Sequence, residues 1–297
     1  MIVADAHAHV FPTPEAGYEW QRMVGVVDPR RAGDLDELKR GMEVAGIDRT
    51  VLLLYARSGE RDAELRAEGR LSEAAIAAVV KREIRELNRW GCAAAAADAR
   101  LIPFVGLNAR HLSPAELIAE LDELLALGAR GVKIIPPSMR LYADDPLLWP
   151  IYQRCWELGL PILSQSGDGG GPAPGPGADH YGRPSHWEPV LREFPGLKLI
   201  LAHLGHGYEE DIVQLAATFD SVHSDTSLRL SRLGRPGFLT RDGLVDLIRR
   251  IGVDRVLFGT NYPFVSPERY RETLLALPLA ADELELIAGG NLERILS

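Results

Sequence analysis

His7 and His9 are the residues of this chain whose type and spacing point most directly to chemistry. They end an apolar run that begins at Ile2, which is typical of a buried β-strand. Alternate residues of a strand point to one side, so the two imidazoles project together, about 7 Å apart at their Cα atoms. Neutral imidazole nitrogen is a common metal ligand. The pair predicts a metal site, with two surface histidines near a terminus as the alternative.

The elements that must position this pair are short apolar runs separated by helical patterns. Eight such runs are found, at residues 2–6, 50–54, 101–107, 131–135, 161–164, 198–202, 221–224 and 255–259. Their near-continuous apolar character is typical of parallel strands covered on both faces. Eight strands alternating with helices predict a (β/α)8 TIM barrel, one domain over residues 1–297, elaborated by loops on its C-terminal face. The alternative is an open doubly wound sheet, but no Gly-x-Gly-x-x-Gly follows the first strand.

Composition excludes some classes of partner and predicts a compartment. The chain has 297 residues, 46% hydrophobic and 25% charged, with a net charge of −9. This acidity argues against nucleic acid or an anionic membrane as the main partner. No apolar run reaches the about 18 residues that span a bilayer, and no secretory signal is visible. Cys92 and Cys155 form no metal or disulfide motif, so we expect buried thiols in a cytoplasmic protein.

In a barrel, the residues that follow the strands face a common mouth. His203 follows the sixth run and supplies a third imidazole beside His7 and His9. Three such ligands suffice for a catalytic metal site with an open position. The other polar residues near strand ends are candidates for neutral or anionic ligands and for substrate contacts; they include Tyr55, Arg57, Lys133, Gln165, Asp168, Asp225 and Asn261.

The motifs in this order resemble those of the amidohydrolase superfamily, in its branch of metal hydrolases and decarboxylases. The resemblance covers the whole chain. It is carried by the segments 5–9 (DAHAH), 131–134 (GVKI), 198–205 (KLILAHLG), 257–263 (LFGTNYP) and 290–296 (GNLERIL). It implies a metal-dependent enzyme on a TIM barrel, acting on a small molecule, and is compatible with a homodimer.

Two positions depart from the pattern that the resemblance implies. Gln165 stands where relatives that bind one metal have a histidine ligand, and Asn261 stands where an aspartate binds metal and takes a proton from water. Asparagine is not a base at neutral pH. The general base must then come from elsewhere, and Asp225, Asp168 and His206 are the candidates.

Three hypotheses follow from this altered site. The first is a metal-dependent hydrolase of a small ester, amide, lactone or thioester, carboxylated or cyclic. The second is a metal-independent lactonase or decarboxylase, in which arginines clamp a carboxylate. The third is a barrel without catalysis that acts as a binding protein.

The first hypothesis assigns the following roles. Zinc is the expected metal, with iron or manganese as alternatives. The metal ligands are His7, His9, His203 and Asn261, with Tyr55 as a phenolate ligand for a harder metal. The catalytic residues are His203, Asn261 and Asp225. The substrate-binding residues are Arg57, Lys133, Gln165, Asp168, His180 and Arg183.

Overall fold

The computed structural model describes residues 1–167 and 180–297, and these contain eight parallel strands in one sheet, in the order of the sequence. The strands are β1 (Ala4–Ala8), β2 (Arg49–Leu54), β3 (Leu101–Gly106), β4 (Gly131–Ile134), β5 (Ile162–Ser164), β6 (Leu199–Leu201), β7 (Val222–Asp225) and β8 (Val256–Leu257). The ring is closed between its first and last strands, because the Ala6 N–H donates to the Phe258 carbonyl at 2.8 Å. This confirms the predicted (β/α)8 barrel.

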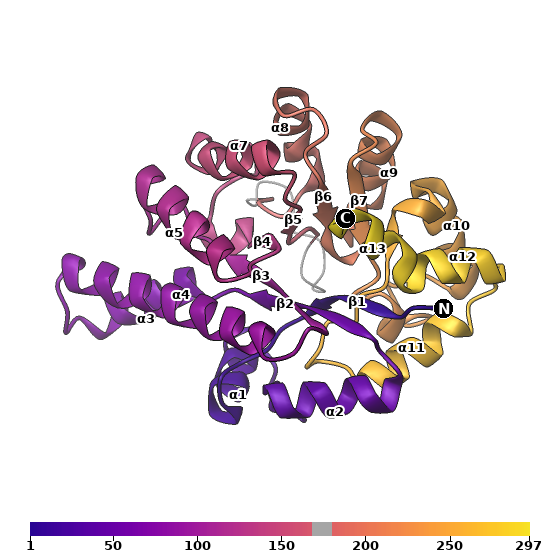
Figure 1. The fold of residues 1–297 in the computed structure, drawn as a ribbon, viewed down its shortest axis with the longest axis horizontal. Helices are drawn as coiled ribbons and strands as arrows, with labels where there is room; N and C mark the ends of the chain where they lie inside the picture. Colours follow the sequence, from indigo (N-terminus) through magenta and orange to yellow (C-terminus); the bar gives the residue numbers. More distant parts are fainter. Residues whose placement is uncertain (168–179) are drawn as a thin grey trace.

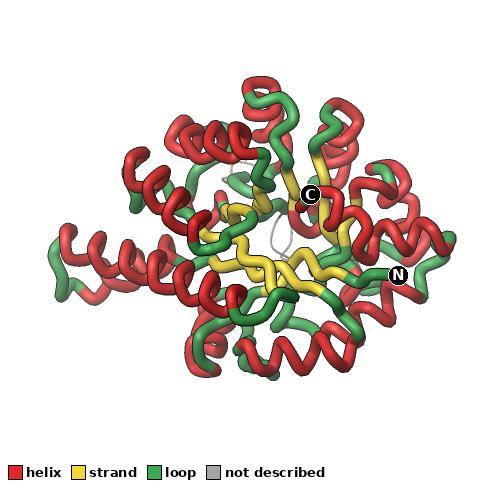
Figure 2. The backbone as a smooth tube through the Cα atoms, in the orientation of Figure 1, coloured by secondary structure: helices red, strands yellow, loops and turns green. Residues whose placement is uncertain are grey.

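Helices surround the strands on the outside of the ring (Figure 2). The longer ones are α1 (Pro14–Met23), α2 (Leu35–Ala45), α3 (Ser58–Glu68), α4 (Glu73–Ala96), α5 (Pro114–Ala126), α7 (Trp149–Leu158), α9 (Glu209–Thr218), α10 (Arg241–Ile251) and α11 (Pro267–Leu275). The shorter ones are α6 (Pro136–Met139), α8 (Glu188–Glu193), α12 (Ala281–Glu285) and α13 (Asn291–Leu296). The pair α3 and α4, both between β2 and β3, extends away from the barrel (Figure 1).

The interior of the barrel is filled by alternate residues of the strands. Ala4 and Ala6 of β1, Val51 and Leu53 of β2, and Phe104 of β3 are buried there. In β2 and β3 the residues on the other face, such as Leu52 and Val105, belong to the cluster that packs against the helices, so both faces of these strands are apolar, as expected for a covered parallel sheet. The last helix, α13, adds Leu292, Ile295 and Leu296 to this interior cluster.

Glycines occur within two of the helical segments. Helix α4 runs unbroken from Glu73 to Ala96 through Gly91. A Cβ on Gly91 would lie 2.2 Å from the Leu54 side chain, so close packing explains the glycine. Near the C-terminus, Leu286–Gly290 form a π-helical turn, which joins α12 to α13.

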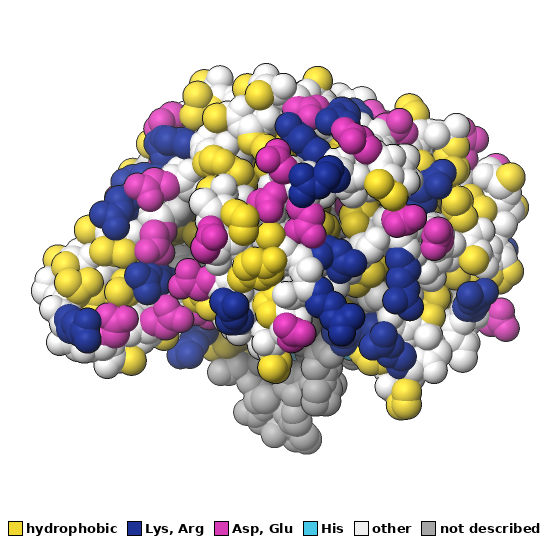
Figure 3. Space-filling model, turned by 90° about the horizontal axis from the view of Figure 1, so that it is seen from below, with side chains coloured by type: hydrophobic (Ala, Val, Ile, Leu, Met, Phe, Trp, Pro, Cys, Tyr) yellow, Lys and Arg dark blue, Asp and Glu magenta, His cyan; other side chains and the backbone are white. Residues whose placement is uncertain are grey.

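The outer surface carries charges of both signs. On the face seen in Figure 3, acidic and basic side chains are interspersed and hydrophobic ones are scattered between them. Within the described ranges, no helix is long and apolar enough to cross a membrane.

Candidate active site

The carboxyl ends of β1 and β7 bring an imidazole and a carboxylate into contact. The His7 Nδ1–H donates to Asp225 Oδ2 at 2.8 Å, and both side chains are fully buried. A carboxylate can only accept, so Nδ1 carries the proton and Nε2 keeps its lone pair. That His7 Nε2 atom is buried and has no hydrogen-bond partner within residues 1–167 and 180–297. The pair therefore presents one unused imidazole nitrogen.

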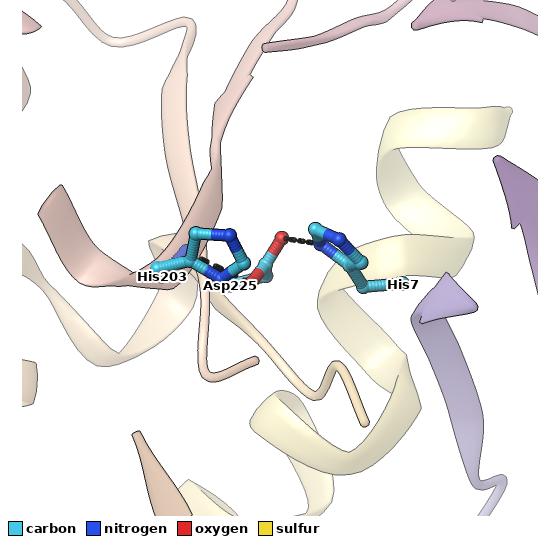
Figure 4. Close-up of side chains that lie close together, drawn as sticks. All are labelled: His7, His203 and Asp225. Carbon is cyan, nitrogen blue, oxygen red and sulfur yellow. Dashed lines mark hydrogen bonds and ion pairs between the residues drawn. The ribbon is translucent and has the colours of Figure 1, made fainter. Parts of the chain in front are cut away.

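His203 approaches the same carboxylate from the end of β6 (Figure 4). Its backbone N–H donates to Asp225 Oδ1 at 3.1 Å. His203 has a φ of 64°, a left-handed conformation that is costly for a residue with a side chain. Such strain is typical of functional sites, and here it turns the imidazole toward His7, with the ring centroids 5.1 Å apart.

A glycine makes room for this meeting of three strands. A Cβ on Gly259, just after β8, would lie 3.0 Å from the His7 Cβ and 3.3 Å from the Asp225 Cβ. Both distances are tighter than ordinary contacts, so a larger residue would push His7 and Asp225 apart. Sequence inspection offered Gly259 only as part of a motif, and the structure gives its physical reason.

The two nitrogens of His203 have different neighbours. Nδ1 lies 2.7 Å from the Ser227 hydroxyl and 3.2 Å from the Ser227 carbonyl oxygen. Because the carbonyl can only accept, Nδ1 carries the proton. Nε2 then keeps its lone pair and faces the side-chain amide of Gln165, whose Oε1 lies 3.2 Å away.

Burial keeps the imidazoles of the site neutral. It lowers the pKa of His203 to about 3 and the pKa of His9 well below its ordinary value. Burial also lowers the pKa of His7, although Asp225 opposes it. Burial alone would raise the pKa of Asp225, but the hydrogen bonds that it accepts from His7 and Ser227 help to hold it below the usual range. The site therefore combines neutral imidazoles with an ionised carboxylate.

Lys133 of β4 adds a cation beneath this group. The Lys133 side chain is fully buried, and its Nζ has no hydrogen-bond partner among the described residues. Burial lowers its pKa to about 7, while the charge of Asp225 acts in the opposite direction. Lys133 lies outside the cavity lining, and its contact with a substrate stays a prediction.

A cavity of about 1040 Å³ opens above the histidines. Trp20 forms part of its wall and packs on the His9 ring, with the centroids 4.7 Å apart. The Arg57 guanidinium lies 5.8 Å from the Trp20 ring centroid and pairs with Glu60. Both Arg57 and Glu60 line the cavity. An aromatic ring and a cation thus border the same space as the site.

The structure brings together some of the predicted residues and separates others. Those that line the cavity are His9, Arg57, Gln165, His180, His203 and Asn261. His7 and Asp225 lie buried beside them. Arg183 is outside the lining and pairs with Asp211 at 2.9 Å. Asp168 lies outside the described residues.

Tyr55 does not join the cavity lining either. Its side chain is buried, and burial raises the pKa of its phenol well above the ordinary value. A phenol that keeps its proton is a poor anionic ligand. The geometry therefore gives the predicted phenolate ligand no support.

Sequence reasoning missed several residues of the site. Ser227 contacts both imidazoles, yet nothing in its pattern distinguishes it from other serines. The segment after β7 also lines the cavity, through Leu228, Ser231, Arg232 and Arg235. The only signal in the sequence was their position after a strand end.

The donor set fits a divalent metal ion. His7, His203 and Asp225 each place a ligand atom within 4.8 Å of the other two. The His7 Nε2, buried and without a hydrogen-bond partner among the described residues, is an acceptor that such an ion would satisfy. Imidazole nitrogens and neutral oxygens suit zinc, iron or manganese.

Solved structures with the same fold include several enzymes. A 2,6-dihydroxybenzoate decarboxylase, in complex with 2,6-dihydroxybenzoate, is 19% identical, with a TM-score of 0.75 over 100% of this chain and 99% of that one. A dihydroxybenzoic acid decarboxylase from Polaromonas, with bound manganese and an inhibitor, is 18% identical, with a TM-score of 0.72 over 99% and 96%. A probable 2-pyrone-4,6-dicarboxylic acid hydrolase from Acinetobacter baumannii, with citric acid bound, is 14% identical, with a TM-score of 0.64 over 100% and 99%.

At these identities the likeness concerns the fold alone. No curated protein matches the sequence. A family model, by contrast, matches residues 4–297, nearly the whole chain, and its description is amidohydrolase, of the second amidohydrolase type. The chain therefore belongs to this amidohydrolase family.

Proposed function

We propose that the chain is a metal-dependent hydrolase that cleaves an ester, amide, lactone or thioester bond of a small organic molecule. The observation that carries this proposal is the pairing of His7 Nδ1 with Asp225, which leaves the buried Nε2 without a partner. A carboxylate held against one imidazole nitrogen is the usual means by which proteins orient the other nitrogen toward a metal ion.

His7, His9 and His203 hold the metal in this proposal, and Asn261 adds a neutral amide oxygen. Zinc is the expected ion, with iron and manganese as alternatives. A divalent ion held by neutral ligands polarises the bond under attack and lowers the pKa of water to about 7. Since this ligand set contains no carboxylate, we expect a low affinity for the metal ion. Because the pKa of the water would be low, we also expect little need for a side chain that acts as a general base.

Asp225 acts through the histidines rather than as the general base. Its Oδ2 accepts from His7, and its Oδ1 accepts from the backbone N–H groups of His203 and Ser227. A carboxylate that accepts so many hydrogen bonds, with its pKa held low, is a weak base. We therefore revise its role from proton abstraction to the orientation of His7 and His203.

The substrate is held by side chains that line the cavity. Arg57 offers a guanidinium, which binds a carboxylate with two hydrogen bonds. His180 also lines the cavity, and its Nδ1 lies 2.6 Å from the Tyr208 hydroxyl oxygen. Gln165 borders the same space and contributes an amide.

The proposal is tested by metal content and by chelation. Protein purified without a histidine tag is expected to contain near one equivalent of zinc, iron or manganese, and a chelator is expected to abolish turnover of a panel of esters and lactones. His9→Ala is expected to lower metal content and activity together. His223→Ala is the matched control, because His223 lies outside the cavity lining and its Nδ1 contacts the Ser221 carbonyl oxygen. Chelator-resistant turnover by metal-free protein would contradict the proposal.

Decarboxylation of a small aromatic or conjugated acid is a second candidate. It is favoured by Asn261, since an amide at the end of β8 cannot take a proton from water whereas loss of carbon dioxide needs no such base. The dihydroxybenzoate decarboxylases with the same fold support this candidate. Release of carbon dioxide from a panel of hydroxybenzoates, without hydrolysis of any ester, would favour it over the hydrolase.

A further inference from the structure

Part of the cavity lining is apolar, and the chemistry proposed above makes no use of it. The segments that follow β1, β7 and β8, three neighbouring strands of the ring, supply six apolar residues of the lining, which we call the apolar wall: Met23, Val24, Val26, Leu228, Phe264 and Val265. Leu228 is buried and the other five are half-buried, so their remaining surface faces space that no described residue fills. Apolar surface left in contact with water is costly unless a ligand covers it.

Local sequence builds the first part of this wall. Helix α1 ends at Met23, and Gly25 follows with a φ of 87°. The Gly25 N–H donates to the Arg22 carbonyl at 2.9 Å and the Val26 N–H donates to the Gln21 carbonyl at 3.0 Å. This is the hydrogen-bond pattern of a Schellman turn, which needs a left-handed residue. The turn brings Val26 to the cavity, whereas Val27, one residue on, is 96% exposed.

The rest of the cavity lining contains Trp20, Ile135 and Pro137 together with polar and cationic side chains. Arg57, His180, Arg232 and Arg235 line it together. Burial and the neighbouring charge of Arg235 lower the pKa of Arg232, so two like charges lie close together at the mouth. A bound anion would relieve their repulsion. The cavity therefore has a cationic part suited to a carboxylate and an apolar part suited to a hydrocarbon.

The volume is large enough for both parts to be occupied at once. At about 1040 Å³, the cavity lies at the upper end of the range of about 300–1,000 Å³ that is usual for small-molecule sites. A ligand that filled only the space beside the histidines and arginines would leave the apolar wall uncovered.

We propose that the apolar wall is a subsite for an alkyl or aryl group, and that the substrates are amphiphilic organic acids, with the carboxylate on the cationic side. This inference rests on the proposed function only in taking this cavity as the substrate site. It goes beyond that function in naming the class of substrate.

The test is the binding of unreactive carboxylates of increasing length to the full chain. Acetate, butyrate, hexanoate and octanoate are titrated by calorimetry. Each methylene that reaches the apolar wall is expected to raise the affinity by up to about fourfold. Affinity that does not change with length, or no binding of any of the four, would overturn the proposal.

Two neighbouring variants sharpen the test. Val26→Asn places an amide on the apolar wall and is expected to lower the affinity for octanoate about tenfold while leaving that for acetate unchanged. Val27→Asn makes the same change on the exposed neighbour and is expected to alter neither. Equal effects of the two variants would refute the subsite. If Val26→Asn does not fold, as judged by circular dichroism, Met23→Gln serves in its place.

These titrations do not depend on turnover. Length-dependent binding in a protein that holds no metal and hydrolyses nothing would leave the subsite standing and reject the proposed function. Metal-dependent hydrolysis, together with an affinity that does not change with the length of the carboxylate, would support the proposed function and reject the subsite.

Discussion

The two ends of the barrel use buried side chains in opposite ways. At the end where the strands begin, α13 closes the ring with Leu292, Ile295 and Leu296, and Lys198 donates to the Ile295 carbonyl at 2.8 Å. At the end where the strands finish, His7, Asp225 and His203 are buried together, and the His7 Nε2 has no partner.

This difference separates stability from function within one fold. Apolar burial at the closed end stabilises the barrel without directional demands. Burial of polar groups at the open end is costly and persists only because neighbouring strands fix the geometry. The division agrees with the general pattern of TIM barrels, in which active sites lie at the C-terminal face. Substitutions at the two ends should therefore affect different properties.

The largest expected effect comes from His203→Ala. Removal of an imidazole from the proposed metal ligands is expected to abolish activity and metal binding, while the melting temperature stays within a few degrees of the parent. Activity is measured on whichever ester or lactone the parent turns over, and metal content by elemental analysis. Full activity in this variant would remove His203 from the site.

The opposite result is expected for Ile295→Ala at the closed end. Loss of a buried isoleucine creates a cavity and is expected to lower the free energy of unfolding by about 2–5 kcal/mol. Activity per folded molecule should remain that of the parent, because Ile295 lies at the other end of the barrel. Urea denaturation gives the first quantity, and a comparable loss of activity at low temperature would contradict the separation of the two ends.

Asp225→Asn tests the orienting carboxylate. The amide can no longer serve as an ionised acceptor for His7, His203 and Ser227, so we expect metal affinity and activity to fall by about 10–100-fold. A general base would have a different signature, since its loss would remove activity without weakening the metal. Competition with a chromophoric chelator measures the affinity.

Lys133→Met should change how stability depends on pH. Burial lowers the pKa of Lys133 from its ordinary 10.5 to about 7 in the folded chain, so between these pH values the unfolded chain binds the extra proton. Stability of the parent should then rise with pH, by about 1.4 kcal/mol per unit from this residue alone, and fall as the pH approaches 7. In the variant this contribution vanishes. Denaturation at pH 7, 8 and 9 provides the comparison, and parallel curves would contradict it.

The smallest effect is expected for Asn261→Asp. A carboxylate at this position adds a negative charge beside the proposed metal, so metal affinity should rise and the acidic limb of the pH–rate profile should move upward by roughly one unit. The parent enzyme under the same metal supply is the reference. An unchanged profile and unchanged affinity would place Asn261 outside the site.

Local sequence patterns were enough to predict the architecture and part of the site. Eight apolar runs at regular intervals predicted the strands, because the side-chain periodicity of a buried strand is local. The spacing of His7 and His9 and the position of His203 after a strand predicted that imidazoles gather at one mouth. The family also followed from short motifs in the right order, and the family model confirms it.

The contacts between these groups became clear from the tertiary structure alone. The contact of His7 with Asp225 joins residues 218 positions apart, and the sequence gives no hint of which carboxylate would meet which imidazole. Distances between strands and loops also decide three other features. They leave Lys133 Nζ without a hydrogen-bond partner among the described residues, they require a glycine at position 259, and they form the apolar wall at the end of α1. Such distances are set by the closure of the barrel and by packing, which no local pattern encodes.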